Sequence, residues 1–139
     1  MEKSEWKGKY FTLHEMTASA TAKRLGIDNT PPSSAITALH ALVDNVLDPL
    51  REAWGSPIRV NSGYRCPELN EAVGGTPGSQ HLRGEAADIT VGSRSANRRL
   101  LALIKRLDLP VDQCIDEKGC RWIHVSHRKG RNRRMYMKF

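Results

Sequence analysis

Two histidines and one aspartate constrain what this chain can fold into. His81 and Asp88 lie seven residues apart within residues 79–88, and His124 follows in the segment Trp122-Ile123-His124. Each of the three lies in or beside a segment typical of a β-strand, so neighbouring strands would bring their side chains together. Two imidazoles and one carboxylate leave a fourth position open for water, which is typical of hydrolytic rather than structural zinc.

The spacing of His81 and Asp88 often arises by chance, but the residues around the pair favour a metal site. Gly84 permits a sharp turn, and the small pair Ala86-Ala87 lets neighbouring backbones approach closely. Asp88 is a charge in an otherwise small and apolar run at residues 85–91. A buried carboxylate is costly unless it is paired or bound to a metal, so the run favours a ligand role for this aspartate.

The sequence predicts four helices. In residues 34–54, apolar side chains recur every three or four positions and form one stripe, which Pro49 should kink or break. Thr12 and Glu15 form a capping box that begins an earlier helix, and Gly26 follows its end. The expected helices are residues 12–23, 34–54, 67–73 and 95–107, the last of them capped by Ser95.

Short apolar or alternating segments predict five strands, and Lys118-Gly119 between two of them signals a hairpin. Few strands, mostly antiparallel, with helices packed on one side give an α+β fold. At this length we expect a single domain over residues 1–139. The expected strands are residues 58–62, 85–91, 112–116, 121–127 and 135–138.

The composition suits a globular protein and excludes several other classes. Of the 139 residues, 39% are hydrophobic, and no apolar run approaches the length of a membrane span. Residues 1–7 contain no apolar stretch of a secretory signal, so we expect a protein made in the cytoplasm. Three cysteines, an odd number, favour reduced thiols. Four residues could also form a structural zinc site, but their spacing matches no familiar zinc motif. They are Cys114, Cys120, His124 and His127.

The net charge of +7 is concentrated in the second half of the chain. Residues 1–90 carry nine basic and eleven acidic side chains, whereas residues 91–139 carry thirteen and four. A basic surface attracts polyanions such as nucleic acid, anionic lipid or an anionic cell-wall polymer, and it is equally typical of a solvated edge. No nucleic-acid recognition motif accompanies the charge, so we expect no specific nucleic-acid partner.

Three motifs together resemble a known family. They are Ser62-Gly63-Tyr64-Arg65, the pattern Ser-x-His-x-x-Gly-x-Ala-x-Asp at residues 79–88, and Trp122-x-His124. The chain resembles the M15 zinc D-Ala-D-Ala peptidases, and within them the phage-endolysin-like and prophage-encoded branch. The resemblance covers nearly the whole chain, including residues 29–32 and 48–51.

The resemblance implies a hedgehog/D-Ala-D-Ala-peptidase-like fold and one zinc ion bound by His81, Asp88 and His124. It also implies a zinc metallopeptidase acting on bacterial peptidoglycan. Such an enzyme hydrolyses D-amino-acid-containing bonds of the stem peptides, as a carboxypeptidase or as an endopeptidase. We expect a monomer that reaches the cell wall after release or export by another factor.

Three further residues gain a role from the resemblance. Arg65 matches the family arginine that holds substrate or stabilises charge at the scissile carbonyl, and a guanidinium there would supply preorganised positive charge. The alternative for Arg65 is a structural salt bridge. Tyr64 and Ser79 are expected to line the same pocket and bind substrate.

At the position of the general base, the chain departs from the family pattern. Many members place Glu or Asp three residues before the last ligand, or His two residues before it. This chain has Arg121 and Trp122 at those positions, and neither can act as a base. Our candidate is Glu117, since Gln113-x-x-x-Glu117 resembles this branch.

The length of the hairpin loop decides between Glu117 and Asp116 as the base. With a loop at residues 118–121, Glu117 pairs with Trp122 and shares its face with His124, about 7 Å along the sheet. A two-residue loop keeps that face but doubles the distance. A three-residue loop turns Glu117 to the other face and favours Asp116.

The missing acid or histidine beside His124 also motivates an alternative function. On the same fold, the chain could be a non-catalytic module that carries zinc and binds the cell wall. The two functions differ in whether any peptide bond is cleaved.

Overall fold

The computed structural model describes residues 6–139. The prediction that no secretory signal is present rests on residues 1–7, and residues 1–5 of these lie outside the described residues. No helix within residues 6–139 is long and apolar enough to cross a membrane. The α-helices are α1 (Leu13–Thr17), α2 (Ala20–Leu25), α3 (Ser33–Leu42), α4 (Asp48–Trp54), α5 (Pro67–Ala72) and α6 (Arg94–Arg106). The strands are β1 (Arg59–Ser62), β2 (Ala86–Thr90), β3 (Gln113–Glu117), β4 (Trp122–Ser126) and β5 (Met135–Lys138).

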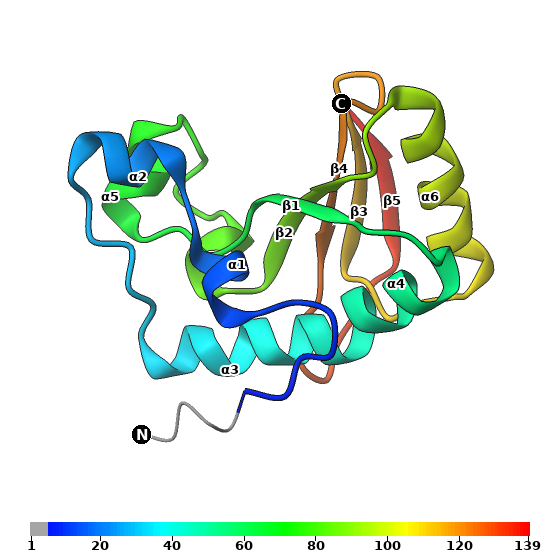
Figure 1. Cartoon of the computed structure of the whole chain (residues 1–139), viewed down its shortest axis with the longest axis horizontal. Helices are drawn as coiled ribbons and strands as arrows, with labels where there is room; N and C mark the ends of the chain where they lie inside the picture. The colour runs from blue at the N-terminus through cyan, green and yellow to red at the C-terminus, as the bar shows by residue number, and fades with distance from the viewer. Residues whose placement is uncertain (1–5) are drawn as a thin grey trace.

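The strands form one five-stranded sheet in the order β1-β2-β4-β3-β5, with α6 beside it and α3 and α4 across its lower end in Figure 1. Neighbouring strands are antiparallel except β3 and β5, which are parallel. The predicted α+β class with a small, mostly antiparallel sheet is therefore confirmed. The predicted strand ends were misplaced by one residue in most cases.

The two faces of the sheet have different roles, because side chains alternate along each strand. One face joins the hydrophobic core that α3, α4 and α6 cover, as predicted. Its residues on the central strands are Ala87, Ile89, Cys114, Ile123 and Val125. The other face carries Asp88, His124 and Glu117, which gathers the polar side chains away from the core.

The longest helical stretch is not broken at Pro49, although a break was one of the two outcomes that the sequence allowed. A π-helical segment at Val43–Leu47 joins α3 to α4, and the Asp48 amide donates to the Val43 carbonyl. The wider π turns lie directly before the proline, where an α-helix would lose a hydrogen bond. The apolar stripe thus stays continuous, and Leu50 beyond the proline remains fully buried.

Two other helix boundaries differ from the predictions. The single helix expected over residues 12–23 is two helices, because Ala18 leaves the helical conformation and the Ser19 hydroxyl caps α2. The Thr12–Glu15 capping box and the left-handed Gly26 are confirmed. The cap of α6 is Ser93 rather than Ser95, and its hydroxyl accepts from the Ala96 amide.

Candidate metal centre

Each of the three predicted ligands lies on a different element. His81 lies on a single 3-10 turn, η3 (Gln80–Arg83), Asp88 is the middle residue of β2, and His124 is the middle residue of β4. Asp88 and His124 are direct partners in the antiparallel β2–β4 register, so their side chains leave the same face next to each other. The 3-10 turn brings His81 over that face.

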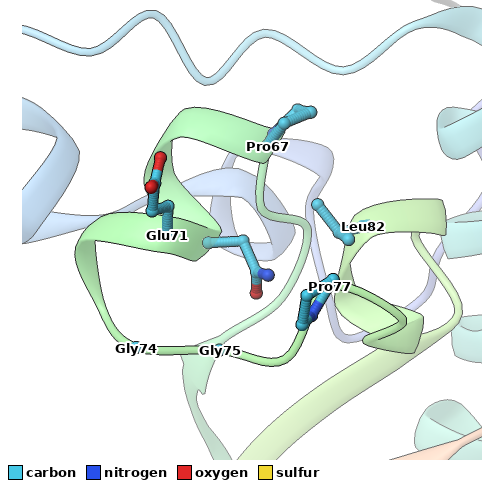
Figure 2. A pocket seen from close by; sticks show the side chains of 7 residues that line it. Pro67, Glu71, Gly74, Gly75, Pro77 and Leu82 are labelled. Atoms are coloured by element: carbon cyan, nitrogen blue, oxygen red, sulfur yellow. The ribbon is translucent and has the colours of Figure 1, made fainter.

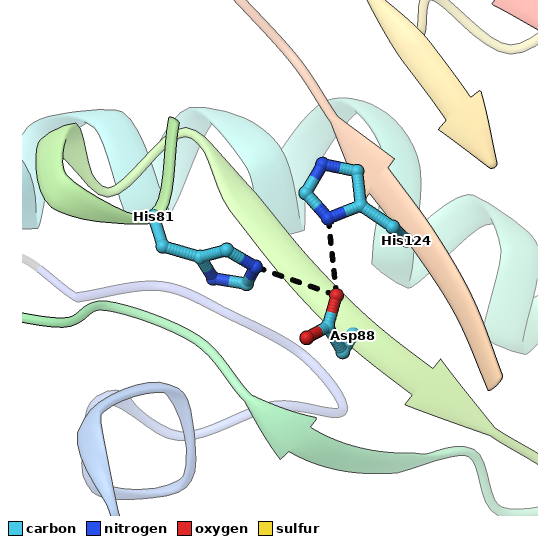
Figure 3. A group of neighbouring side chains, drawn as sticks. All are labelled: His81, Asp88 and His124. Carbon is cyan, nitrogen blue, oxygen red and sulfur yellow. Dashed lines mark hydrogen bonds and ion pairs between the residues drawn. The ribbon is translucent and has the colours of Figure 1, made fainter. Parts of the chain in front are cut away.

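The ligand atoms converge on one oxygen of Asp88 (Figure 3). His81 Nε2 lies 3.3 Å and His124 Nδ1 lies 3.0 Å from Asp88 Oδ1. The donor atoms of all three residues lie within 4.8 Å of one another. These side chains are nearly buried, and burying polar groups is costly unless they are paired or bind a metal. The cluster therefore differs from a group of polar side chains that lie together on the surface.

This donor set fits one zinc ion. Metal–ligand bonds of about 2.0–2.2 Å in a tetrahedron separate neighbouring donor atoms by about 3.3 Å, close to the distances in the cluster. In the part of the chain that the structure describes, this is the one group of His, Cys, Asp and Glu side chains close enough to share an ion. The cysteine-containing set is therefore not assembled, because Cys114 faces the core and His124 the opposite side.

Backbone and side-chain partners orient the ligands from behind. His81 Nδ1 lies 2.6 Å from the carbonyl oxygen of Gly63, so this nitrogen carries the proton and Nε2 is free to bind a metal. Arg65 Nη2 lies 3.4 Å from Asp88 Oδ2, which leaves Oδ1 between the two histidines. Nothing in the residue pattern predicted the contact of the Gly63 carbonyl, although Gly63 belongs to the motif that contains Arg65.

Asp88 is held as a carboxylate. Burial alone would raise the pKa of Asp88, but hydrogen bonds with His124 and His81 outweigh it and hold the pKa well below its usual value. A metal ligand must be deprotonated, so this aspartate is prepared to bind a cation at neutral pH.

Gly84 provides the sharp turn that the sequence predicted between His81 and Asp88. It ends the 3-10 turn in the left-handed conformation, with φ of +74°, and a Cβ at this position would lie 2.5 Å from the Ala35 carbonyl oxygen. A side chain is excluded both by the conformation and by the contact with α3. The glycine therefore sets the approach of the turn to the helix and to β2.

A cleft of about 500 Å³ opens beside the metal centre. Ser79, a predicted substrate-binding residue, lines it, and its hydroxyl accepts from the His81 amide. Gln113, from the pattern Gln113-x-x-x-Glu117, also lines it, together with residues that the sequence did not single out: Ile115, Arg83, Arg128 and Phe139. They are far apart in the sequence, and none belongs to one of the three motifs except Arg83.

Arg65 and Tyr64, unlike Ser79, are not among the residues that line the cleft. The Arg65 guanidinium donates to Ser62 Oγ, Asn70 Oδ1 and Asp88 Oδ2, so the salt-bridge alternative describes its contacts in the structure. The Tyr64 side chain is in the hydrophobic core and is not among the residues that line this cleft. Direct contact of either residue with substrate stays a prediction.

Glu117 faces the same cleft as His124. The hairpin loop occupies residues 118–121, and Glu117 pairs with Trp122, which is the loop length that puts Glu117 on the His124 face. Burial raises the pKa of the Glu117 carboxyl above its usual value. Asp116 points to the opposite face, where its carboxylate accepts from the Cys120 amide within the hairpin loop.

A second pocket of about 390 Å³ lies on the η3 and α5 side (Figure 2). The loop before η3 separates the cleft from this second pocket. Thr76, Gly78 and Ser79 line the cleft. Gly74, Gly75 and Pro77 line the second pocket. None of the three metal ligands lines the second pocket, so the candidate chemistry belongs to the cleft.

Comparison with known proteins agrees with this geometry. The Peptidase M15 family profile matches residues 9–126. The zinc D-Ala-D-Ala carboxypeptidase of Streptomyces albus G is 42% identical over 64 residues, which cover 45% of this chain and 25% of that protein. The chain thus matches about a quarter of the length of that relative. Because the family match covers most of the chain and all three clustered ligands, the chain belongs to the peptidase M15 family.

Proposed function

We propose that this protein is a zinc-dependent peptidase that hydrolyses D-amino-acid-containing bonds in the stem peptides of bacterial peptidoglycan. The observation that carries the proposal is the cluster of His81, Asp88 and His124 beside a cleft that also holds the Glu117 carboxylate. The name of the Streptomyces albus G relative supports the substrate class. Zinc held by such ligands polarises a peptide carbonyl and makes water more acidic.

Glu117 has the properties of the general base. It lies two residues along the sheet from His124, about 7 Å, which leaves room for a water molecule between them. Its pKa is raised by burial, towards the pH at which the enzyme would work. In our proposal the carboxylate accepts a proton from the attacking water and passes it to the nitrogen of the leaving amine.

Arg65 acts in this proposal as a positioning residue. Its guanidinium holds Asp88 Oδ2 while Ser62 and Asn70 hold the guanidinium, so the carboxylate cannot rotate freely. Ser79, whose hydroxyl lies at the cleft, is placed to contact the peptide near the cleaved bond.

The test is Glu117→Gln in the zinc-loaded protein, which keeps the side-chain shape and removes the base. We expect hydrolysis of cell-wall peptides to fall by about 10²–10⁴-fold while zinc content and thermal stability stay unchanged. Glu71→Gln, an exposed acid outside the cleft, is the matched control and should keep full activity. Free D-alanine among the products indicates a carboxypeptidase, and cut cross-links indicate an endopeptidase.

One observation favours a second candidate, a zinc-bearing module that binds the wall without cleaving it. Arg121 and Trp122 occupy the positions where many family members carry a base. This candidate predicts one zinc per chain and wall binding, with no turnover at any pH. Cleavage by the wild type that disappears in Glu117→Gln would eliminate it.

A further inference from the structure

The cleft beside the metal centre carries more positive than negative charge. Besides Glu117 and Asp112, its lining includes three arginines, Arg83, Arg128 and Arg133. Arginine clusters in a cleft attract anionic ligands, and a guanidinium fits a carboxylate with two parallel hydrogen bonds. The contacts of each arginine show which guanidinium is free to bind a carboxylate.

Two of the three arginines are already paired within the protein. Arg83 Nε lies 2.9 Å from Glu85 Oε1. Arg133 donates from Nε and Nη2 to the two oxygens of Asp112, each at 2.8 Å. These pairs neutralise the charge of both guanidinium groups, so neither is available as a strong anion site.

Arg128 differs from the other two. Its side chain is exposed at the cleft and makes no ion pair or hydrogen bond with any residue from 6 to 139. Its backbone is held on both sides by Asn132, whose Oδ1 accepts from the Arg128 amide at 2.8 Å and whose Nδ2 donates to the Arg128 carbonyl at 2.9 Å. The result is a fixed backbone that carries a free guanidinium.

The position of Arg128 matches the length of a short peptide. It follows His124 by four residues, which places its Cα at most about 14 Å from that ligand at about 3.4 Å per residue. A substrate bound in an extended conformation advances by a similar distance per residue. A carboxylate one to a few residues from the cleaved bond therefore comes within reach of the long arginine side chain.

We propose that Arg128 is a specificity-determining residue that binds a free carboxylate of the stem peptide. This inference rests on the proposed function and names the chemical group that the cleft selects. Arg83 and Arg133 are held by Glu85 and Asp112, so the direct contact with the ligand belongs to Arg128. Two carboxylates of stem peptides have this chemistry: the C-terminal one and the α-carboxylate of a D-isoglutamyl residue.

The test compares Arg128→Gln with Arg131→Gln, which removes the same charge from the same loop at an exposed residue outside the cleft lining. Binding is measured by calorimetry on the zinc-loaded Glu117→Gln background, so that the peptides survive. The first probe pair is diacetyl-L-Lys-D-Ala-D-Ala with a free or an amidated C-terminus. The second pair has an amidated C-terminus and a D-isoglutamyl residue whose α-carboxylate is free or amidated.

We expect Arg128→Gln to weaken binding of one free-carboxylate peptide by about tenfold or more and to leave its amidated partner unchanged. Arg131→Gln should change neither. The pair that responds identifies the carboxylate. Equal losses for free and amidated peptides, equal losses in both variants, or displacement of the peptide by inorganic phosphate at the peptide's own concentration would overturn the inference.

Cleavage assays on the wild-type background separate this inference from the proposed function. If no variant cleaves any peptide but Arg128→Gln still discriminates in binding, the peptidase proposal fails and the carboxylate site stands. If the wild type cleaves free and amidated peptides equally well and Arg128→Gln matches Arg131→Gln, the carboxylate site fails and the peptidase proposal stands.

Discussion

Gly63 serves the metal centre through its backbone. Its carbonyl oxygen fixes the proton of His81 on Nδ1, and its own position is set by a close contact with α1. A Cβ at residue 63 would lie 2.1 Å from the carbonyl oxygen of Met16, which also accepts from the Tyr64 amide at 2.8 Å. The packing of β1 against α1 and the orientation of a ligand thus depend on one missing side chain.

Gly63→Ala is expected to destabilise the protein by about 1–3 kcal/mol, because a backbone carbonyl has to move away from the new methyl group. The same movement shifts the acceptor of His81 and should weaken zinc binding. Thermal unfolding and zinc titration measure the two effects. Gly78→Ala is the control, since a Cβ there meets nothing within 4 Å; an equal loss of stability in this variant would contradict the explanation.

At the level of elements, α6 shows how the sequence can leave a helix start uncertain. Ser93 and Ser95 are both cap-type residues two positions apart, and the periodic apolar stripe fits a start at either one. In the structure, Ser93 is extended, and its hydroxyl accepts from the Ala96 amide at 3.1 Å. The Ser95 hydroxyl instead accepts from the exposed side chain of Arg99.

Ser93→Ala should therefore lower the free energy of unfolding by about 1 kcal/mol, because the first turn of α6 loses its side-chain acceptor. Ser95→Ala removes a hydroxyl from the same turn and should change stability by less than about 0.5 kcal/mol. Chemical denaturation of both variants gives the comparison. Equal effects, or a larger effect at Ser95, would contradict the assignment of the cap.

The β3–β4 hairpin shows the opposite case, in which a small element decides a functional position. The sequence predicted a hairpin near Lys118-Gly119 and left three loop lengths open. The four-residue loop is fixed by positive φ angles at residues 118–120 and by the Asp116 carboxylate, which accepts from the Cys120 amide at 2.6 Å. This loop length places Glu117, and not Asp116, on the face of His124.

For the molecule as a whole, Asp112 joins parts of the chain that are distant in sequence. Its buried carboxylate accepts from Gln80, next to His81, and from the side chain and backbone of Arg133, two residues before β5. Its backbone amide donates to the Ser126 carbonyl at the end of β4. One residue therefore connects the 3-10 turn of the metal centre with the ends of the two strands that flank β3, β4 and β5.

Arg133→Met should destabilise the protein by about 2 kcal/mol at neutral pH, since the buried carboxylate loses its charged donors. The pKa of Asp112 is lowered to about 2, and the hydrogen bond from the Arg133 side chain is the largest cause of this shift. Because that pKa is depressed, the stabilisation is complete above about pH 4 and is lost as the pH falls towards 2. The stability gap between wild type and variant should therefore narrow below about pH 4.

Urea denaturation between pH 3 and 8 measures this gap. Arg134→Met is the matched control, because its guanidinium pairs with Asp108, whose side chain is 77% exposed, and such surface pairs contribute little. A gap for Arg133→Met that is the same at all pH values, or an equally large loss in Arg134→Met, would show that Asp112 is not the cause.

The sequence by itself determined the local features of this protein. Residue types and short spacings are properties of neighbouring positions, so they identified the candidate ligands His81, Asp88 and His124, the Gly84 turn, and the alternating strands of an α+β sheet. The M15 resemblance rests on the same local motifs. The differences at Pro49 and Ser95 are local too: a π-helical segment lies before the proline, so the helix is not broken there, and the Ser93 hydroxyl caps α6 in place of Ser95.

Only the tertiary structure decided which distant residues meet. The β2–β4 register pairs Asp88 with His124, the hairpin loop turns Glu117 to the cleft, and the path after β4 brings Arg128 to the same space. The carbonyl of Gly63 reaches His81 across eighteen positions. Such contacts depend on strand order and loop length, which are fixed by burying the shared core and not by any one segment, so a single sequence does not specify them locally.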